Sequence, residues 1–87
     1  MTKPKLTGVA KQINKLGLVV GDTIFGRQED SEYWHEAKLT LLWVGNKEAV
    51  WLESERGSVA EKWSEPREST AWTLDYRKWT KVPKEPT

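Results

Sequence analysis

The residues best suited to catalysis or metal binding surround the single histidine of the chain. His35 lies shortly after Asp30 and Glu32 and directly before Glu36. A histidine beside carboxylates can act as a general base or as one ligand of a metal ion. The chain has no cysteine and no second histidine, so the usual zinc ligand sets and a cysteine nucleophile are excluded. We therefore interpret His35 as a surface residue at the start of a strand, and we expect no catalytic residue, no metal and no cofactor.

Other catalytic patterns are equally weak. Asp30-Ser31 and Ser64-Glu65 place serines beside acids, which is typical of turns. The glycines Gly17, Gly21 and Gly26 fit neither the dinucleotide-binding spacing nor the Walker spacing. The sequence therefore predicts a protein that binds rather than an enzyme.

Tryptophan is the unusual residue type of this 87-residue chain. The six tryptophans are Trp34, Trp43, Trp51, Trp63, Trp72 and Trp79. Each ring can bury about 150–250 Å², so several of them can supply the core of a small domain that has no disulfide. We interpret Trp43, Trp72 and Trp79 as core residues, whereas Trp63, close to Pro66, fits the core or a binding surface.

The clearest element is a strand over residues 33–44, in which apolar residues alternate with polar ones. Gly45-Asn46 predicts a tight hairpin turn, and residues 49–54 then form the return strand. This register places Thr40 opposite Trp51. Trp34 has the same parity as Thr40, so Trp34 and Trp51 are expected on the outer face, away from the core.

The rest of the chain predicts further short elements around this hairpin. They are a short helix at 8–17, with Val9, Ile13 and Leu16 at helical spacing and Gly17 as its C-cap, strands at 23–27, 59–63, 71–74 and 79–82, and one helical turn at 75–78 that Asp75 caps. A polar, acidic connection is expected at 28–32 and a turn at 55–58. The fold class that follows is mostly β, a small SH3-like β-barrel of about five short strands. We expect one domain over 8–82, with flexible ends at 1–7 and 83–87.

Charge and hydropathy narrow the range of partners. Fourteen basic residues nearly balance thirteen acidic ones, which does not favour a dedicated nucleic-acid-binding protein. No apolar run reaches the length of a membrane span, and no signal peptide is recognisable. We therefore expect a cytoplasmic protein without membrane contact, either a monomer or a homodimer.

Four sequence stretches resemble a group of uncharacterised short proteins of tailed bacteriophages. They are VGDTIFGR at 20–27, WHEAKLTLLW at 34–43, WSEP at 63–66 and WTLD at 72–75. More loosely, their order is similar to the plan of small SH3-like domains of phages. The resemblance implies a phage origin, the cytoplasm of a bacterial host and an accessory role in host takeover. It transfers no catalytic or binding residue.

Two binding functions remain open for the outer face. The first is an exposed aromatic patch that binds a host or phage protein through Trp34, Trp51, Lys38, Arg27 and Trp63. The alternative is that the same rings stack on single-stranded nucleic acid, helped by the basic residues beside them. A third interpretation gives the face no function, because the N-terminal segment with Val9, Ile13 and Leu16 folds across it and buries both Trp34 and Trp51.

Overall fold

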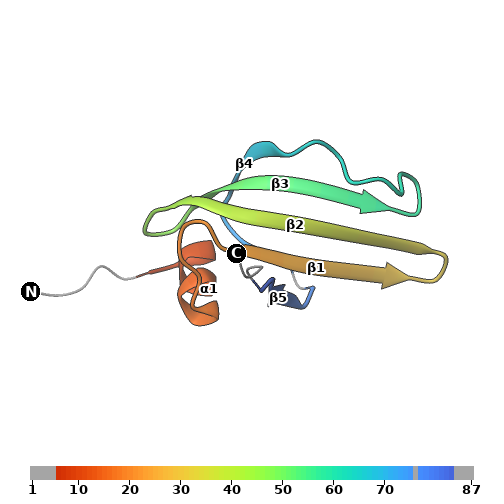
Figure 1. The fold of residues 1–87 in the computed structure, drawn as a ribbon. Helices are drawn as coiled ribbons and strands as arrows, with labels where there is room; N and C mark the ends of the chain where they lie inside the picture. Colours follow the sequence, from red (N-terminus) through yellow and green to blue (C-terminus); the bar gives the residue numbers. More distant parts are fainter. Residues whose placement is uncertain (1–5, 76, 84–87) are drawn as a thin grey trace, which may run out of the picture.

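One antiparallel sheet and one short helix make up the domain. The computed structural model describes residues 6–75 and 77–83. In chain order the elements are α1 (Gly8–Leu16), β1 (Thr23–Asp30), β2 (Tyr33–Val44), β3 (Ala49–Gly57), β4 (Arg67–Ala71) and β5 (Trp79–Lys81). The strand order is β4-β3-β2-β1-β5, so β4 and β5 form the two edges of the sheet (Figure 1). The prediction of a mostly β domain with five short strands and an N-terminal helix is therefore confirmed.

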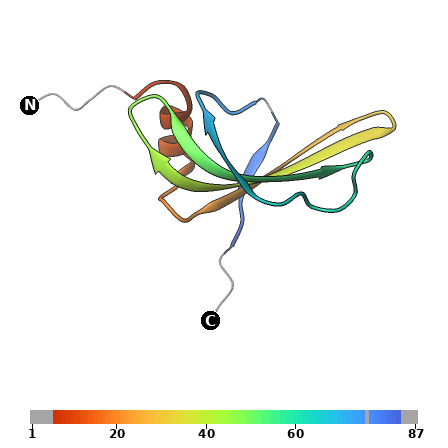
Figure 2. The ribbon, with the colours of Figure 1, turned by 90° about the horizontal axis from the view of Figure 1, so that it is seen from above.

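β1 and β2 form a long hairpin that extends away from α1, with β3 running beside it (Figure 2). Its pairing runs without interruption from Thr23 opposite Thr40 to Asp30 opposite Tyr33. The turn is only Ser31-Glu32, with Ser31 at a φ of 55°. The predicted acidic connection over 28–32 is therefore too long, because its first three residues continue the pairing with β2.

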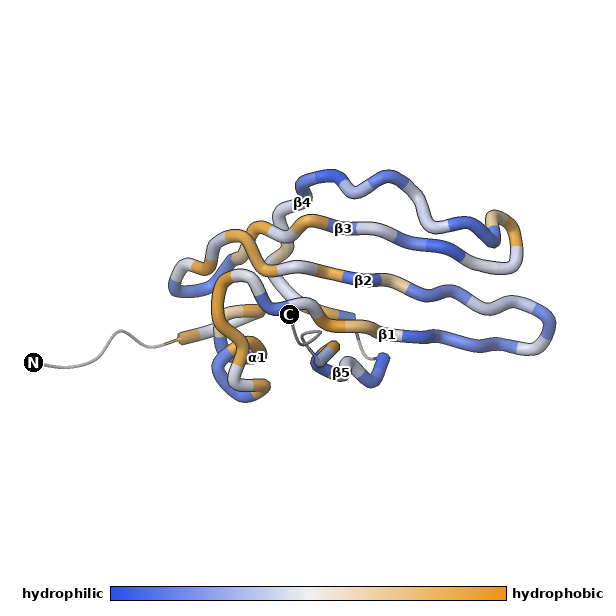
Figure 3. Tube along the Cα trace, in the orientation of Figure 1, coloured by the Kyte–Doolittle hydropathy of each residue, from blue (hydrophilic) through white to orange (hydrophobic). Residues whose placement is uncertain are grey.

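α1 covers one face of the sheet, which we call the inner face; the opposite face is the outer face. Val9 and Ile13 of α1 pack with the apolar residues of the sheet in one core cluster. Gly17 ends the helix in the left-handed conformation, at a φ of 69°, as predicted. Leu16, predicted on the same apolar stripe, is instead exposed. Figure 3 shows that hydrophobic residues gather where α1 meets the sheet, whereas the far end of the β1–β2 hairpin is hydrophilic.

The pairing of β2 with β3 differs from the prediction by one residue. The turn contains four residues, closed by a hydrogen bond from Gly45 N–H to the carbonyl of Glu48 (2.8 Å). The register then shifts between Leu41 and Trp43, so Leu41 faces Trp51. A slip of one residue moves every side chain of a strand to the other face. Trp51 therefore lies in the inner-face core at 1% exposure, and its predicted place on the outer face is wrong.

In the second half of the chain, the described residues form fewer strands than predicted, and the strands have other bounds. β3 continues through the predicted turn at 55–58, and residues 59–63 form no strand. β4 lies at 67–71 rather than at 71–74. The described residues of the predicted helical turn at 75–78 form no helix, and Tyr76 lies outside the described residues. So do 1–5 and 84–87, most of the predicted loose ends.

Two further tryptophans lie where the sequence did not predict them. Trp43 is 50% exposed and Trp72 is 58% exposed, so neither belongs to the core. Trp79 packs against the core cluster as expected.

Among residues 6–75 and 77–83, no helix has the length and apolar character needed to cross a membrane.

Candidate binding face

Four of the five predicted site residues come together on the outer face. Trp34 and Lys38 share one face of β2, because alternate residues of a strand point to the same side. Arg27 of β1 pairs with Glu36, between them on β2. Trp63 reaches the same face from the 58–66 segment and stacks with Lys38. Only Trp51 is separated from the group, on the inner face.

The 58–66 segment folds back along β3 and brings Trp63 onto the sheet. Ser64 fixes it with three hydrogen bonds. Its N–H donates to the carbonyl of Glu55 (2.8 Å), its carbonyl accepts from Ser54 Oγ (2.6 Å), and its Oγ accepts from Glu55 N–H (3.0 Å). The Trp63 ring then meets Phe25 of β1 edge to face, at an interplanar angle of 67° and with ring centroids 6.4 Å apart. The indole is thus held by contacts to both β1 and β3.

A buried carboxylate organises the cations of this face. The Glu36 side chain is 6% exposed and accepts hydrogen bonds from Arg56 Nε (2.6 Å) and from one terminal nitrogen of Arg27 (3.0 Å). Burial alone raises the pKa of Glu36. The hydrogen bonds from Arg56 and Arg27, with their positive charges, outweigh burial and leave the pKa below its ordinary value. Glu36 therefore stays ionised and holds both guanidinium groups in place.

The cations stack on the two indole rings. Arg56 lies between them, 4.7 Å from the centroid of the Trp63 ring and 5.8 Å from that of Trp34. Arg27 lies 5.0 Å from Trp34, and the Lys38 ammonium lies 4.4 Å from Trp63. These distances are within the range of cation–π attraction. The rings and the cations thus form one continuous layer, which we call the cation–indole cluster (Arg27, Trp34, Lys38, Arg56 and Trp63).

Two cations of this cluster keep unused binding capacity. Lys38 has no carboxylate within ion-pair distance among the described residues. Arg56 uses only Nε on Glu36, so in the described structure its two terminal nitrogens donate to no acceptor. A guanidinium fork and an ammonium, both free to donate, can bind an external carboxylate or phosphate.

Grooves flank the cluster on both sides. One groove of about 430 Å³ is lined by Leu52, Trp63 and Pro66 together with Lys38 and Thr40. A second groove of about 460 Å³ lies beyond Arg56 and reaches around to the inner face, because its lining also includes His35 and Glu55. Its apolar lining includes Tyr33, Trp34, Val59 and Ala60. Ser64 borders both grooves, so they adjoin.

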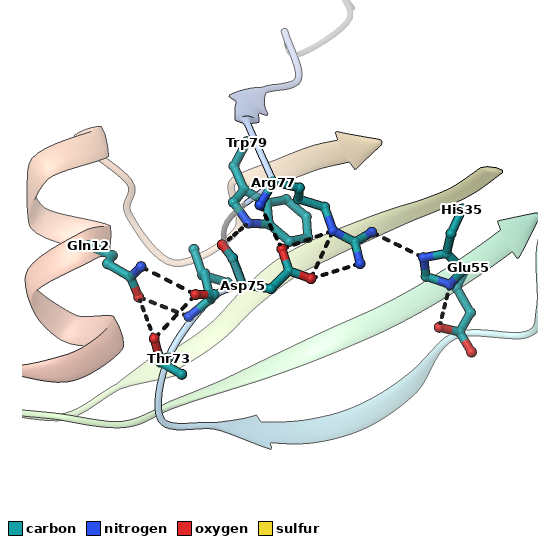
Figure 4. A network of polar contacts seen from close by, with 8 residues as sticks. Gln12, His35, Glu55, Thr73, Asp75, Arg77 and Trp79 are labelled. Carbon is teal, nitrogen blue, oxygen red and sulfur yellow. Dashed lines mark hydrogen bonds and ion pairs between the residues drawn. The ribbon is translucent and has the colours of Figure 1, made fainter. Parts of the chain in front are cut away.

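His35 lies on the inner face, and its side chain contacts Glu55 and Arg77 rather than the acids that are its neighbours in sequence. Its Nε2 lies 3.1 Å from Glu55, and its Nδ1 lies 3.1 Å from a terminal nitrogen of Arg77 (Figure 4). Arginine can only donate, so Nδ1 accepts and Nε2 carries the proton. Glu36, its neighbour in sequence, belongs to the outer face.

No group of three metal-binding side chains occurs in the part of the chain that the structure describes.

Phe25, Glu36 and Arg56 complete the outer face but were not predicted there. Arg56 was missed because residues 55–58 were assigned to a turn, whereas β3 extends through Arg56. Glu36 carried a detectable signal, since its position on the strand has the same parity as Trp34 and Lys38. The sequence matches no family model and no curated protein, and the structure matches no solved structure.

Proposed function

We propose that this domain is a binding module whose outer face takes up an extended, acidic segment of another protein. The observation that carries the proposal is the pair of cations with unused donors, Lys38 and Arg56, fixed on two indoles above an apolar groove. Acidic side chains of a partner would pair with these donors. Because the donors are already held in place, little side-chain entropy is lost when a carboxylate binds.

The shape of the face favours an extended segment over a compact ligand. The first groove follows the outer face past Lys38, Leu52 and Trp63, and the second continues it from Ser64 past Arg56. Beyond Leu52, the outer face continues to Val50, which pairs with the half-exposed Trp43. A chain lying along this path would place apolar residues at the Trp43 end and acids beside Lys38 and Arg56.

Single-stranded nucleic acid is the weaker candidate for the same face. Base stacking needs an open indole face. In this structure Arg27, Arg56 and Lys38 occupy positions over Trp34 and Trp63. A base would have to displace these cations, whereas a carboxylate can bind them where they lie.

Selection from a library of short random peptides tests the proposal. We expect the selected peptides to combine acidic and apolar residues, and we expect Lys38→Ala and Arg56→Ala each to weaken their binding by about tenfold, or about 1.4 kcal/mol. Lys11→Ala is the matched control, because Lys11 is an exposed cation of α1.

Two results would contradict the proposal. One is a set of selected peptides without acids, or with affinities that Lys38→Ala and Arg56→Ala leave unchanged. The other is stronger, salt-sensitive binding of an oligothymidylate that depends on the same two residues, which would assign the face to nucleic acid.

A further inference from the structure

The second groove, which lies beyond Arg56, is built on a tight turn at the end of β3. Gly57 N–H donates to the carbonyl of Ala60 (2.8 Å), and Ser58 N–H donates to the carbonyl of Trp34 (3.0 Å). Trp34 N–H donates in return to Ser58 Oγ (3.4 Å). A Cβ on Gly57 would lie 2.7 Å from the carbonyl oxygen of Trp34, so the close approach of the turn to β2 requires glycine. These contacts fix one wall of the groove before any ligand binds.

The groove presents apolar surface that the fold leaves uncovered. Val59 is 89% exposed and Tyr33 is 68% exposed, and both line the groove. The half-buried Trp34 and the exposed Ala60 add to the same apolar lining. Apolar side chains that gather around a groove, unlike single exposed ones, mark interaction sites. The groove therefore fits a ligand with an apolar body.

Two cations with unused donors line the same groove. Arg56 gives only Nε to Glu36, so its two terminal nitrogens donate to no acceptor in the described structure. Lys62 is exposed and has no carboxylate within ion-pair distance among the described residues. Glu55 is the acid among the described lining residues, and it accepts the Nε2 proton of His35. The groove therefore favours a ligand that carries a carboxylate beside its apolar body.

The carboxylate and the apolar body of this ligand must be close together. The Arg56 guanidinium lies only 5.8 Å from the centroid of the Trp34 ring. In an extended segment, consecutive side chains point to opposite sides, and side chains two residues apart are about 7 Å from each other. The C-terminal residue of a protein instead carries its α-carboxylate on the same Cα as its side chain. An apolar C-terminal residue thus supplies both groups at the required spacing.

Charge at the end of the β1–β2 hairpin gives a second reason for a chain end at this place. Tyr33 and Trp34 are the first residues of β2, so the groove borders the turn between β1 and β2. The exposed acids Glu29, Asp30 and Glu32 lie at this end of the hairpin, which is hydrophilic (Figure 3). An acidic segment that continued beyond the groove would be repelled by these carboxylates. The segment is therefore expected to end inside the groove.

We propose that the second groove binds the C-terminal residue of the partner protein. This residue is apolar, and its side chain lies against Trp34 and Val59. Its α-carboxylate pairs with Arg56 and Lys62, whereas the acids that precede it reach Lys38 in the first groove. The inference rests on the proposed function, since it states which part of the acidic segment enters the second groove and in which direction the segment runs.

Titration of the ¹⁵N-labelled protein with N-acetylphenylalanine tests the carboxylate contact without the rest of a partner. The indole N–H signal of Trp34, identified as the one that Trp34→Phe removes, reports the titration. We expect this signal to shift and to saturate. N-acetylphenylalaninamide replaces the carboxylate by a neutral amide, and acetate lacks the apolar body, so each should bind at least about tenfold more weakly.

Variants assign the two contacts of the probe. Lys62→Ala and Val59→Ser should each weaken N-acetylphenylalanine by about three- to tenfold. Both residues are exposed, so the fold tolerates the changes. Lys11→Ala, which removes an exposed cation of α1, is the matched control. Lys38→Ala should also leave this titration unchanged, because Lys38 lines the first groove and not the second.

Extension of the probe connects the groove to a partner protein. A short peptide with aspartates before a C-terminal phenylalanine should bind more tightly than N-acetylphenylalanine, and amidation of its C-terminus should weaken it about tenfold. The inference is overturned if amidation has no effect or if Lys62→Ala and Val59→Ser bind the probe as the natural chain does. It is also overturned if the added aspartates contribute no affinity, which would assign the groove to a free small acid.

The same titrations separate this inference from the proposed function. Acidic peptides whose binding depends on Lys38 but not on a free C-terminus would refute the inference and support the proposed function. Binding that depends on the free C-terminus and on Lys62, but not on Lys38, would support the C-terminal site and refute the acidic path along the first groove.

Discussion

Both faces of the sheet carry arginines and carboxylates, but a different charge remains unpaired on each face. On the inner face Arg77 is taken up by Asp75 and His35, and a carboxylate, that of Glu53, is left over. On the outer face the carboxylate of Glu36 is taken up by two arginines, and cationic donors are left over. An unpaired carboxylate on the inner face and unpaired cationic donors on the outer face thus offset each other within a chain of near-zero net charge.

Tryptophan differs between the faces in the same way. Trp51 on the inner face is enclosed by aliphatic residues of the core. Trp34 and Trp63 on the outer face are covered by cations. The first ring stabilises the fold by burial, whereas the other two position charges on the surface.

The largest expected effect comes from truncating the inner-face ring. Trp51→Ala removes the largest fully buried side chain of the core. We expect a loss of about 3–5 kcal/mol in the free energy of unfolding, measured by urea denaturation. Trp43→Ala removes a half-exposed ring of the outer face and should cost less than about 1 kcal/mol. Equal losses in the two variants would refute the assignment of the faces.

The second effect concerns the helix that covers the inner face. Gly8 has a φ of 58°, and an added Cβ would lie 2.6 Å from the carbonyl oxygen of Trp72 and 2.8 Å from that of Lys47. Gly8→Ala should therefore displace the start of α1 and cost about 2–4 kcal/mol. Gly17→Ala is the control, since its Cβ would meet nothing within 4 Å and only the left-handed backbone, about 1–2 kcal/mol, is penalised. A smaller cost at Gly8 than at Gly17 would contradict the tight docking of α1.

The third and smallest effect is a dependence on pH that belongs to the outer face. Glu36→Gln should cost about 1–3 kcal/mol at neutral pH, because the charge that holds Arg27 and Arg56 is lost. The pKa of Glu36 in the folded protein is lower than the ordinary value of 4.5. Its stabilising contribution is therefore complete above about pH 4.5 and is lost as the pH falls through the folded-state pKa.

Urea denaturation at neutral and at acidic pH measures this dependence. The difference in stability between the natural chain and Glu36→Gln should shrink on acidification. Glu29→Gln, which removes an exposed acid that also contacts Arg27, should show little change at either pH. A difference that grows in acid would mean that burial, and not the two arginines, controls the titration of Glu36.

Local sequence signals were sufficient where one pattern decided the structure. The alternation over 33–44 predicted β2 with its correct bounds, and Gly17 predicted the end of α1. The grouping of Trp34 with Lys38 followed from their parity on one strand. SH3-like barrel closure, a phage origin and the cellular compartment stay predictions.

Tertiary contacts decided what no local pattern could. The sequence by itself determined the helix, the three long strands and which residues within each of these strands share a face, because these depend on neighbouring residues. The side of the sheet on which Trp51 lies depends on the four-residue turn and on the register shift after Leu41. The helix needs an apolar face to cover, and burying the indole there stabilises the fold more than exposing it on the far side. The two faces, and with them the position of the cation–indole cluster, were thus set by packing across the whole domain.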